Sequence, residues 1–98
     1  MKLADLFKSV QEVNLTKTQL ENYHTELTSL FAAMHLELAE IEKKEALFIL
    51  ASELKTSAAK KEAWRGTELG QRDIELTHYA RATEKVLSSL KNRMYGTY

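Results

Sequence analysis

The sequence predicts an all-α protein: an antiparallel, coiled-coil-like helical hairpin with a short N-terminal helix, assembled as a homo-oligomeric bundle or ring. The 98 residues contain no Pro and only three Gly, so few positions favour turns. Apolar residues recur every seven positions from Leu20 to Phe48, which is the repeat of a packed helical seam. A polar segment at residues 55–57 then separates two arms that we expect to form a single domain.

The first predicted element is a short amphipathic helix over residues 2–13. Its apolar residues share one face at helical spacing: Leu3, Leu6, Phe7, Val10 and Val13. We expect a break at residues 14–16, because Thr16 and Gln19 match a capping box, in which both side chains bond free backbone N–H groups. The alternative is that this helix continues directly into the next one.

The second predicted element is a long helix over residues 17–54. Two columns of residues interleave along it, so that the spacing between successive residues alternates between four and three. One column is Leu20, Leu27, Met34, Ile41 and Phe48, and the other is His24, Phe31, Leu38 and Glu45. From Ala46 to Leu54 the helix is apolar on most sides. A helix that is apolar all round is normally buried, so we expect this end to lie inside the assembly.

The third predicted element is a long helix over residues 58–95, capped by Thr56 or Ser57 and antiparallel to the second. Gly66 and Gly70 each cost about 1 kcal/mol relative to Ala in a helix. They mark either a break at 66–70 or a close contact between helices, and we favour a continuous helix ending before Gly96. Its seam comprises Leu69, Leu76, Ala80, Thr83, Leu87, Leu90 and Met94.

Composition limits the function. The chain has no Cys, so it has neither disulfides nor thiolate metal ligands, and no apolar run approaches the length of a membrane span. The N-terminal residues lack the apolar core of a secretory signal, which predicts a cytoplasmic location. No phosphate-binding loop or nucleophilic triad is present, so we expect neither catalysis nor a cofactor. Because helices of this size enclose a thin core, we expect copies to associate.

The two arms differ in charge. Residues 1–54 contain five Lys/Arg and nine Asp/Glu, whereas residues 55–98 contain nine and five. The arms could simply attract each other in the hairpin, or the basic arm could face an anionic partner.

A basic cluster with one indole suggests a candidate single-stranded-DNA site. Cations that neutralise phosphates beside an aromatic stacking platform are typical of single-strand binders. The candidate residues are Lys55, Lys60, Lys61, Trp64, Arg65 and Arg72. The alternative is that Trp64 is a core anchor covered by Lys side-chain stems. A second cluster of this kind comprises Lys91, Arg93, Tyr95 and Tyr98.

Two E-x-x-H motifs, Glu21/His24 and Glu75/His78, permit a third hypothesis. Di-metal carboxylate bundles use two such pairs with additional Glu ligands, and Glu45 is the one Glu on the seam. The alternative is that His24 is a polar seam residue that sets the helix register, and we predict no metal ligands.

Three segments resemble small helical phage proteins of the UvsY recombination-mediator type. They are residues 38–46, 54–63 and 82–93, within a match that spans roughly residues 15–94. The resemblance implies a hairpin protomer in a ring that binds single-stranded DNA and works with recombination proteins in the host cytoplasm. The chain is shorter than the best-known member and neutral rather than basic.

Two main hypotheses follow. The first is a non-enzymatic phage-type accessory protein of recombination or replication that binds single-stranded DNA as a homo-oligomer. The second is a helical interaction module that docks onto a host or defence protein, and it predicts an exposed apolar stripe on the long helix. A di-metal bundle is the third hypothesis.

Overall fold

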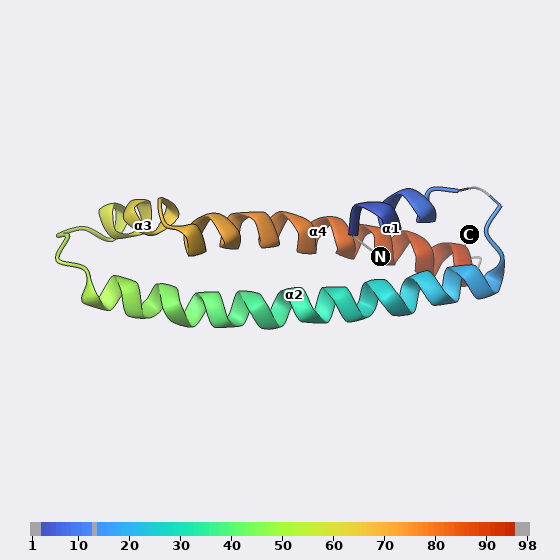
Figure 1. Cartoon of the computed structure of the whole chain (residues 1–98), viewed down its shortest axis with the longest axis horizontal. Coiled ribbons are helices and arrows are strands. Elements are labelled where there is room, and N and C mark those ends of the chain that lie inside the picture. The colour runs from blue at the N-terminus through green and yellow to red at the C-terminus, as the bar shows by residue number, and fades with distance from the viewer. Residues whose placement is uncertain (1–2, 13, 96–98) are drawn as a thin grey trace. The chain divides into compact units, whose positions relative to one another are not determined.

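The computed structural model describes residues 3–12 and 14–95, and every regular element in those ranges is a helix. The order is α1 (Leu3–Val10), α2 (Lys17–Ala51), α3 (Ser57–Arg65) and α4 (Glu68–Tyr95) (Figure 1). Because α2 packs against α4, the predicted all-α hairpin with a short first helix is confirmed. Val13 and Gly96, assigned above to a helix face and a helix stop, lie outside the described residues.

The chain divides into two compact units. Unit 1 comprises Met1–Ala33 and Ala80–Tyr98, and unit 2 comprises Met34–Tyr79. Unit 1 therefore contains three helical segments, from α1, the first half of α2 and the end of α4. Unit 2 contains the second half of α2, the short helix α3 and the beginning of α4.

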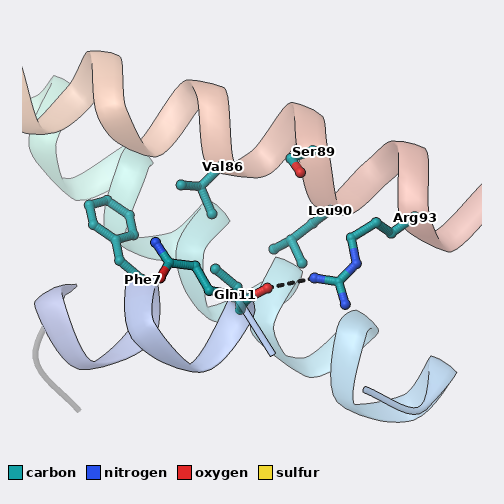
Figure 2. A pocket seen from close by; sticks show the side chains of 7 residues that line it. Phe7, Gln11, Val86, Ser89, Leu90 and Arg93 are labelled. Atoms are coloured by element: carbon teal, nitrogen blue, oxygen red, sulfur yellow. Dashed lines mark hydrogen bonds between the residues drawn. The ribbon is translucent and has the colours of Figure 1, made fainter. Parts of the chain in front are cut away.

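Unit 1 has a closed apolar core to which all three of its helical segments contribute. The buried residues of that core are Leu6, Val10, Leu20, Leu27 and Leu90, and Phe7, Tyr23 and Val86 pack around them. The Arg93 guanidinium of α4 donates a hydrogen bond to the carbonyl oxygen of Val10 (2.5 Å; Figure 2) and another to that of Glu12 (2.7 Å). These bonds satisfy carbonyls at the end of α1 that have no partner within the helix, and they attach α1 to α4.

Unit 2 has a thinner core. Its buried apolar side chains are Met34, Ile41, Trp64 and Leu76. In α2 as a whole, the first predicted column is buried from Leu20 to Ile41 and half-buried at Phe48, and the second column is half-buried throughout. The predicted seam of the long helix is therefore confirmed. On α4 the seam is confirmed from Leu76 to Met94, but Leu69 is exposed.

The predicted starts of the second and third helices are confirmed at the level of hydrogen bonds. The Thr16 N–H donates to Gln19 Oε1 (2.9 Å), and the Gln19 N–H donates to Thr16 Oγ1 (3.1 Å), which is the reciprocal capping box. Thr56 caps α3 by accepting the Ala59 N–H at 3.0 Å.

Two predicted helix ends are too long. α2 ends at Ala51 rather than at residue 54, because Ser52 Oγ accepts the Leu54 N–H (3.3 Å) in place of a helical carbonyl. The first helix ends at Val10, and the Gln11 and Glu12 N–H groups bond the carbonyls of Lys8 and Ser9 in tighter turns.

The continuous helix favoured for residues 58–95 is wrong, since α3 ends at Arg65 and α4 begins at Glu68. Gly66 has ordinary helical dihedrals (φ −78°, ψ −10°), so its backbone does not require glycine. The break instead follows from Thr67, whose hydroxyl donates to the Trp64 carbonyl (2.6 Å) and accepts the Gly70 N–H (3.0 Å). That is the geometry of a helix N-cap.

Gly70 is required by a close contact at the same junction. A Cβ atom on Gly70 would lie 2.0 Å from the Trp64 carbonyl oxygen, a distance that no side chain tolerates. The Gln71 side-chain amide adds a hydrogen bond to the Arg65 carbonyl (2.6 Å). The glycine pair therefore marks both a break and a close helix contact, the two alternatives that the sequence offered.

Candidate functional site

Trp64, the proposed stacking platform for DNA, is part of the unit 2 core. Its side chain is 5% exposed, and its ring centroid lies 5.5 Å from that of Phe48 at an interplanar angle of 56°. Within the described part of the chain the indole N–H has no hydrogen-bond partner. A base cannot stack on a ring that is enclosed in this way. The alternative interpretation, a core anchor, is the one that matches this geometry.

The five cations proposed with Trp64 have different surroundings. Lys55 and Lys61 are exposed, and Lys60 is half-buried. Arg65 is exposed and lies 3.6 Å from Glu62, one helical turn away. Three exposed cations, Lys55, Lys61 and Arg65, therefore remain accessible to an anionic partner.

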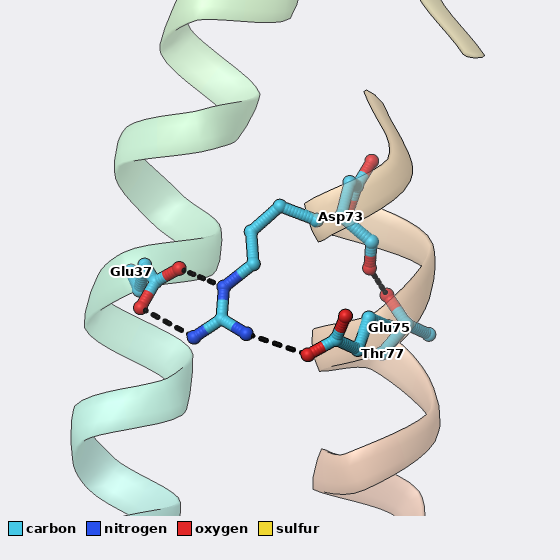
Figure 3. Close-up of polar contacts among 5 residues, drawn as sticks. Glu37, Asp73, Glu75 and Thr77 are labelled. Atoms are coloured by element: carbon cyan, nitrogen blue, oxygen red, sulfur yellow. Dashed lines mark hydrogen bonds and ion pairs between the residues drawn. The ribbon is translucent and has the colours of Figure 1, made fainter. Parts of the chain in front are cut away.

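Arg72, the sixth proposed DNA contact, joins two helices of unit 2. Its Nε and Nη2 atoms donate to the two carboxylate oxygens of Glu37 on α2 at 2.7 and 3.3 Å. Its Nη1 atom donates to Glu75 at 2.8 Å (Figure 3). The bidentate hydrogen bond from Arg72 lowers the pKa of Glu37, and Glu37 in turn raises the pKa of Arg72. This guanidinium is committed to the hairpin and is not a free phosphate ligand.

The most distinctive surface of unit 2 is a column of exposed leucines, here called the leucine stripe. It consists of Leu36 (72% exposed), Leu47 (66%) and Leu50 (81%) on α2, with Leu54 (46%) just beyond the helix. Ala39 and Ala46 lie beside these leucines and are also exposed. Within one copy the apolar end of α2 is therefore exposed at Leu47 and Leu50, and its burial inside an assembly stays a prediction.

The leucine stripe is part of a wider asymmetry between the units. Among the described residues, eight large apolar side chains are exposed, and all but Tyr95 belong to unit 2. The others in unit 2 are Leu69, Ile74 and Tyr79. Single exposed apolar residues are common on protein surfaces, but their concentration in one unit makes that unit the candidate binding surface.

The two E-x-x-H motifs belong to different units. Glu21 and His24 belong to unit 1, whereas Glu75 and His78 belong to unit 2, where Glu75 pairs with Arg72. Over residues 3–12 and 14–95, no group of three or more His, Asp or Glu residues is arranged to hold a metal ion. The geometry gives the di-metal hypothesis no support.

In the second aromatic and basic cluster, Arg93 is committed to the fold, whereas Lys91 is exposed. Arg93 bonds the carbonyls at the end of α1, and Tyr95 is exposed, while Tyr98 lies outside the described residues. A shallow cavity of about 280 Å³ adjoins Arg93, lined also by Phe7, Gln11, Val86, Ser89 and Leu90 (Figure 2). Because the Arg93 guanidinium is already bonded to carbonyls, Gln11 and Ser89 are the polar side chains that remain for a ligand in this cavity.

No described helix combines the length and apolar character needed to span a bilayer. No protein-family model matches this chain, and neither a curated protein nor a solved structure matches it. The resemblance to UvsY-type mediators therefore stays a prediction.

Sequence reasoning missed two features, and each had a signal. Glu37 and Arg72 carry opposite charges at similar distances from the turn on the two arms, which is the condition for pairing in an antiparallel hairpin. The second feature is the exposure of Leu47 and Leu50 within one copy, since the apolar pattern after Ala46 predicts burial of this end only inside an assembly. Counting the faces of the helix would have shown that α4 covers only one of them.

Proposed function

We propose that this protein is a non-enzymatic interaction module that binds a helix along the leucine stripe. The observation that carries the proposal is the exposure of Leu36, Leu47 and Leu50 on α2 of unit 2. An exposed apolar stripe on the long helix is what the interaction-module hypothesis predicts. Helical partners recognise such stripes through their own apolar faces, with anchors three or four residues apart.

The environment of the stripe supports this proposal. The charged residues that interrupt the stripe, Glu40 and Lys43, already pair with each other at 3.5 Å. A partner helix would therefore meet Leu, Ala and one ion pair, so the surface between Leu36 and Leu47 carries no net charge on that face. The flanking Ala39 and Ala46 allow close approach of a second helix.

Binding of single-stranded DNA is the second candidate function, and the three exposed cations around α3 favour it. With Trp64 buried, a strand would be held by phosphate contacts alone. Three such contacts predict a slope of about −2 in log K against log salt for a single strand. Anisotropy titrations of an unstructured oligonucleotide at low and moderate salt test this, and salt-independent or undetectable binding at micromolar protein would exclude it.

The interaction-module proposal is tested by comparative capture with three baits. The baits are the wild-type chain, the double variant Leu47→Glu/Leu50→Glu and the control Ile74→Glu, which alters an exposed apolar residue on α4 of the same unit. We expect a defined set of proteins to be retained by the wild type and the control and lost by the double variant. If the double variant retains the same proteins as the wild type, the stripe is not the binding surface.

A further inference from the structure

We infer that the cavity between α1 and α4 of unit 1 is a binding site for a small carboxylic acid with an apolar body. The cavity has a volume of about 280 Å³ and belongs to unit 1, whereas the leucine stripe of the proposed function belongs to unit 2. Three features of the cavity carry the inference: apolar walls, two side chains without hydrogen-bond partners and a positive charge that no carboxylate neutralises.

The walls of the cavity are apolar. Val86 and Leu90 lie one turn apart on α4, and Phe7 and Val10 line the cavity from α1 (Figure 2). Val10 and Leu90 belong to the buried core of unit 1, whereas Phe7 and Val86 are half-buried. An apolar cavity of about 150 Å³ is large enough to hold benzene. This cavity therefore has room for one ring and a short chain.

Two polar side chains at the cavity are free to bind a ligand. Gln11, in the turn after α1, and Ser89, on α4, both line the cavity and are both exposed. Within residues 3–12 and 14–95, neither the Gln11 amide nor the Ser89 hydroxyl has a hydrogen-bond partner. The Gln11 backbone N–H bonds the Lys8 carbonyl at 3.2 Å, which fixes the turn that carries this amide. An amide and a hydroxyl can each donate to one oxygen of a carboxylate.

The Arg93 guanidinium gives the cavity a positive charge. Its partners in the described part of the chain are the carbonyl oxygens of Val10 and Glu12, which are dipoles and do not neutralise it. The Glu12 side chain is exposed and does not line the cavity. Residues 80–95 add to the positive charge, since they contain four Lys/Arg and one Glu. An anion held by the two free donors would therefore be attracted by Arg93 without displacing it from the carbonyls.

These features together select the class of ligand. The apolar walls favour a ring or a branched chain, and the two donors favour an acceptor group at one end of it. A neutral acceptor would satisfy the donors alone, whereas a carboxylate satisfies both the donors and the uncompensated charge. A ligand of this class would contact Gln11 and Ser89 at once and so join α1 to α4, in addition to the Arg93 hydrogen bonds.

Titration of the full chain with phenylacetate, followed by backbone amide NMR shifts, tests the site. We expect saturable shifts at the residues that line the cavity, with a dissociation constant of about 1 mM, because the ligand is small and the cavity is open to solvent. Phenylacetamide has the ring without the charge and should bind at least about fivefold more weakly. Acetate has the charge without the ring and should give no saturable shift.

The variant Gln11→Ala/Ser89→Ala tests the two donors. Both side chains are exposed, so their removal should leave the helices intact, which circular dichroism verifies. We expect the dissociation constant for phenylacetate to rise at least about fivefold. Ser88→Ala is the matched control, because Ser88 is also exposed on α4 but does not line the cavity. Its dissociation constant should stay within about twofold of the wild type.

Hydrogen exchange tests whether the ligand joins the two helices. A ligand that binds only the folded state stabilises the contacts that form its site. Saturating phenylacetate should therefore slow exchange in α1 and leave the unit 2 part of α2 unchanged. Unchanged exchange in α1 would show that the ligand does not bridge α1 and α4, and would overturn the site as described.

Three titration results would also overturn the inference. The first is the absence of saturable shifts up to about 20 mM phenylacetate, roughly twenty times the expected dissociation constant. The second is binding of phenylacetamide as tight as that of phenylacetate, which would show that the charge plays no part. The third is unchanged affinity in the variant that lacks both donors.

Discussion

Units 1 and 2 are built on the same two long helices but differ in how completely the apolar surface is covered. In unit 1, α1 adds a third helical segment, and Leu6 and Val10 close the core over Leu27 and Leu90. In unit 2, α3 continues the arm of α4, so α2 has helices on one face only. Exposed large apolar residues are accordingly concentrated in unit 2.

This difference shows what a third helix contributes. Two packed helices bury one face each, whatever the composition of their other faces. A third helix covers a groove between the two, and unit 1 attaches its third helix through Arg93. The absence of an equivalent helix among the described residues of unit 2 leaves room for one from another molecule.

The largest expected effect contrasts the core of unit 1 with the leucine stripe of unit 2. Leu27→Ala removes a fully buried side chain of unit 1 and should lower the free energy of unfolding by about 2–5 kcal/mol. Leu50→Ala should change it by less than about 0.5 kcal/mol at low protein concentration, because its side chain is exposed. Urea denaturation monitored by circular dichroism measures both, and equal losses would contradict the contrast.

The next effect concerns the junction that positions Trp64 in unit 2. Gly70→Ala places a methyl group 2.0 Å from the Trp64 carbonyl oxygen, so the backbone of the junction must shift, which costs at least the ~1–3 kcal/mol of ordinary overpacking. Because the chain has one Trp, its fluorescence reports the junction directly. We expect a red-shifted emission as the Trp64 indole becomes more exposed to water. Gly66→Ala is the matched control, since its Cβ would meet no atom closer than 3.5 Å.

A smaller effect concerns the attachment of α1 in unit 1. Arg93→Ala leaves the carbonyls of Val10 and Glu12 without their charged donor, which should cost about 1–2 kcal/mol. Hydrogen exchange should accelerate in α1 and remain slow in the unit 2 part of α2. Arg93→Lys is the control, because a lysine keeps the charge but not the fork of donors. Uniform acceleration throughout the chain would argue against a local role.

The smallest effect concerns the ion pair of unit 2. Arg72 and Glu37 are both about 40% exposed (42% and 44%), so Glu37→Gln should cost less than about 1 kcal/mol. Because the pKa of Glu37 is lowered in the folded protein, the contribution of the pair is present at neutral pH. It should decline as the pH falls below about 4.5 towards the folded pKa.

The measurement is the pH dependence of unfolding in the wild type and in Glu37→Gln. The difference between the two curves should shrink at acidic pH. Glu40→Gln is the control, since it removes an exposed contact within one helix. A difference that stays constant from neutral pH to pH 3 would contradict a role for the Glu37 charge.

Much of the fold could be predicted from the sequence because the signals were local. The seven-residue repeat identified the buried column of α2, and Thr16, Gln19 and Thr56 identified helix starts that the hydrogen bonds confirm. The break before α4 was harder to predict from the sequence. The two glycines signalled it, but the decisive group was the Thr67 hydroxyl, which bonds the last turn of α3 and the first turn of α4.

By itself, the sequence determined that the chain is helical on both arms and which column of α2 faces inward, because periodicity is a property of neighbouring residues. Only the tertiary structure decided the fate of Trp64, Arg72 and the leucine stripe. The burial of Trp64 depends on Phe48 from the other arm, and Arg72 is held by Glu37 across the hairpin. Leu50 is exposed because packing covers one face of a helix at a time, and no third helix of unit 2 reaches the other.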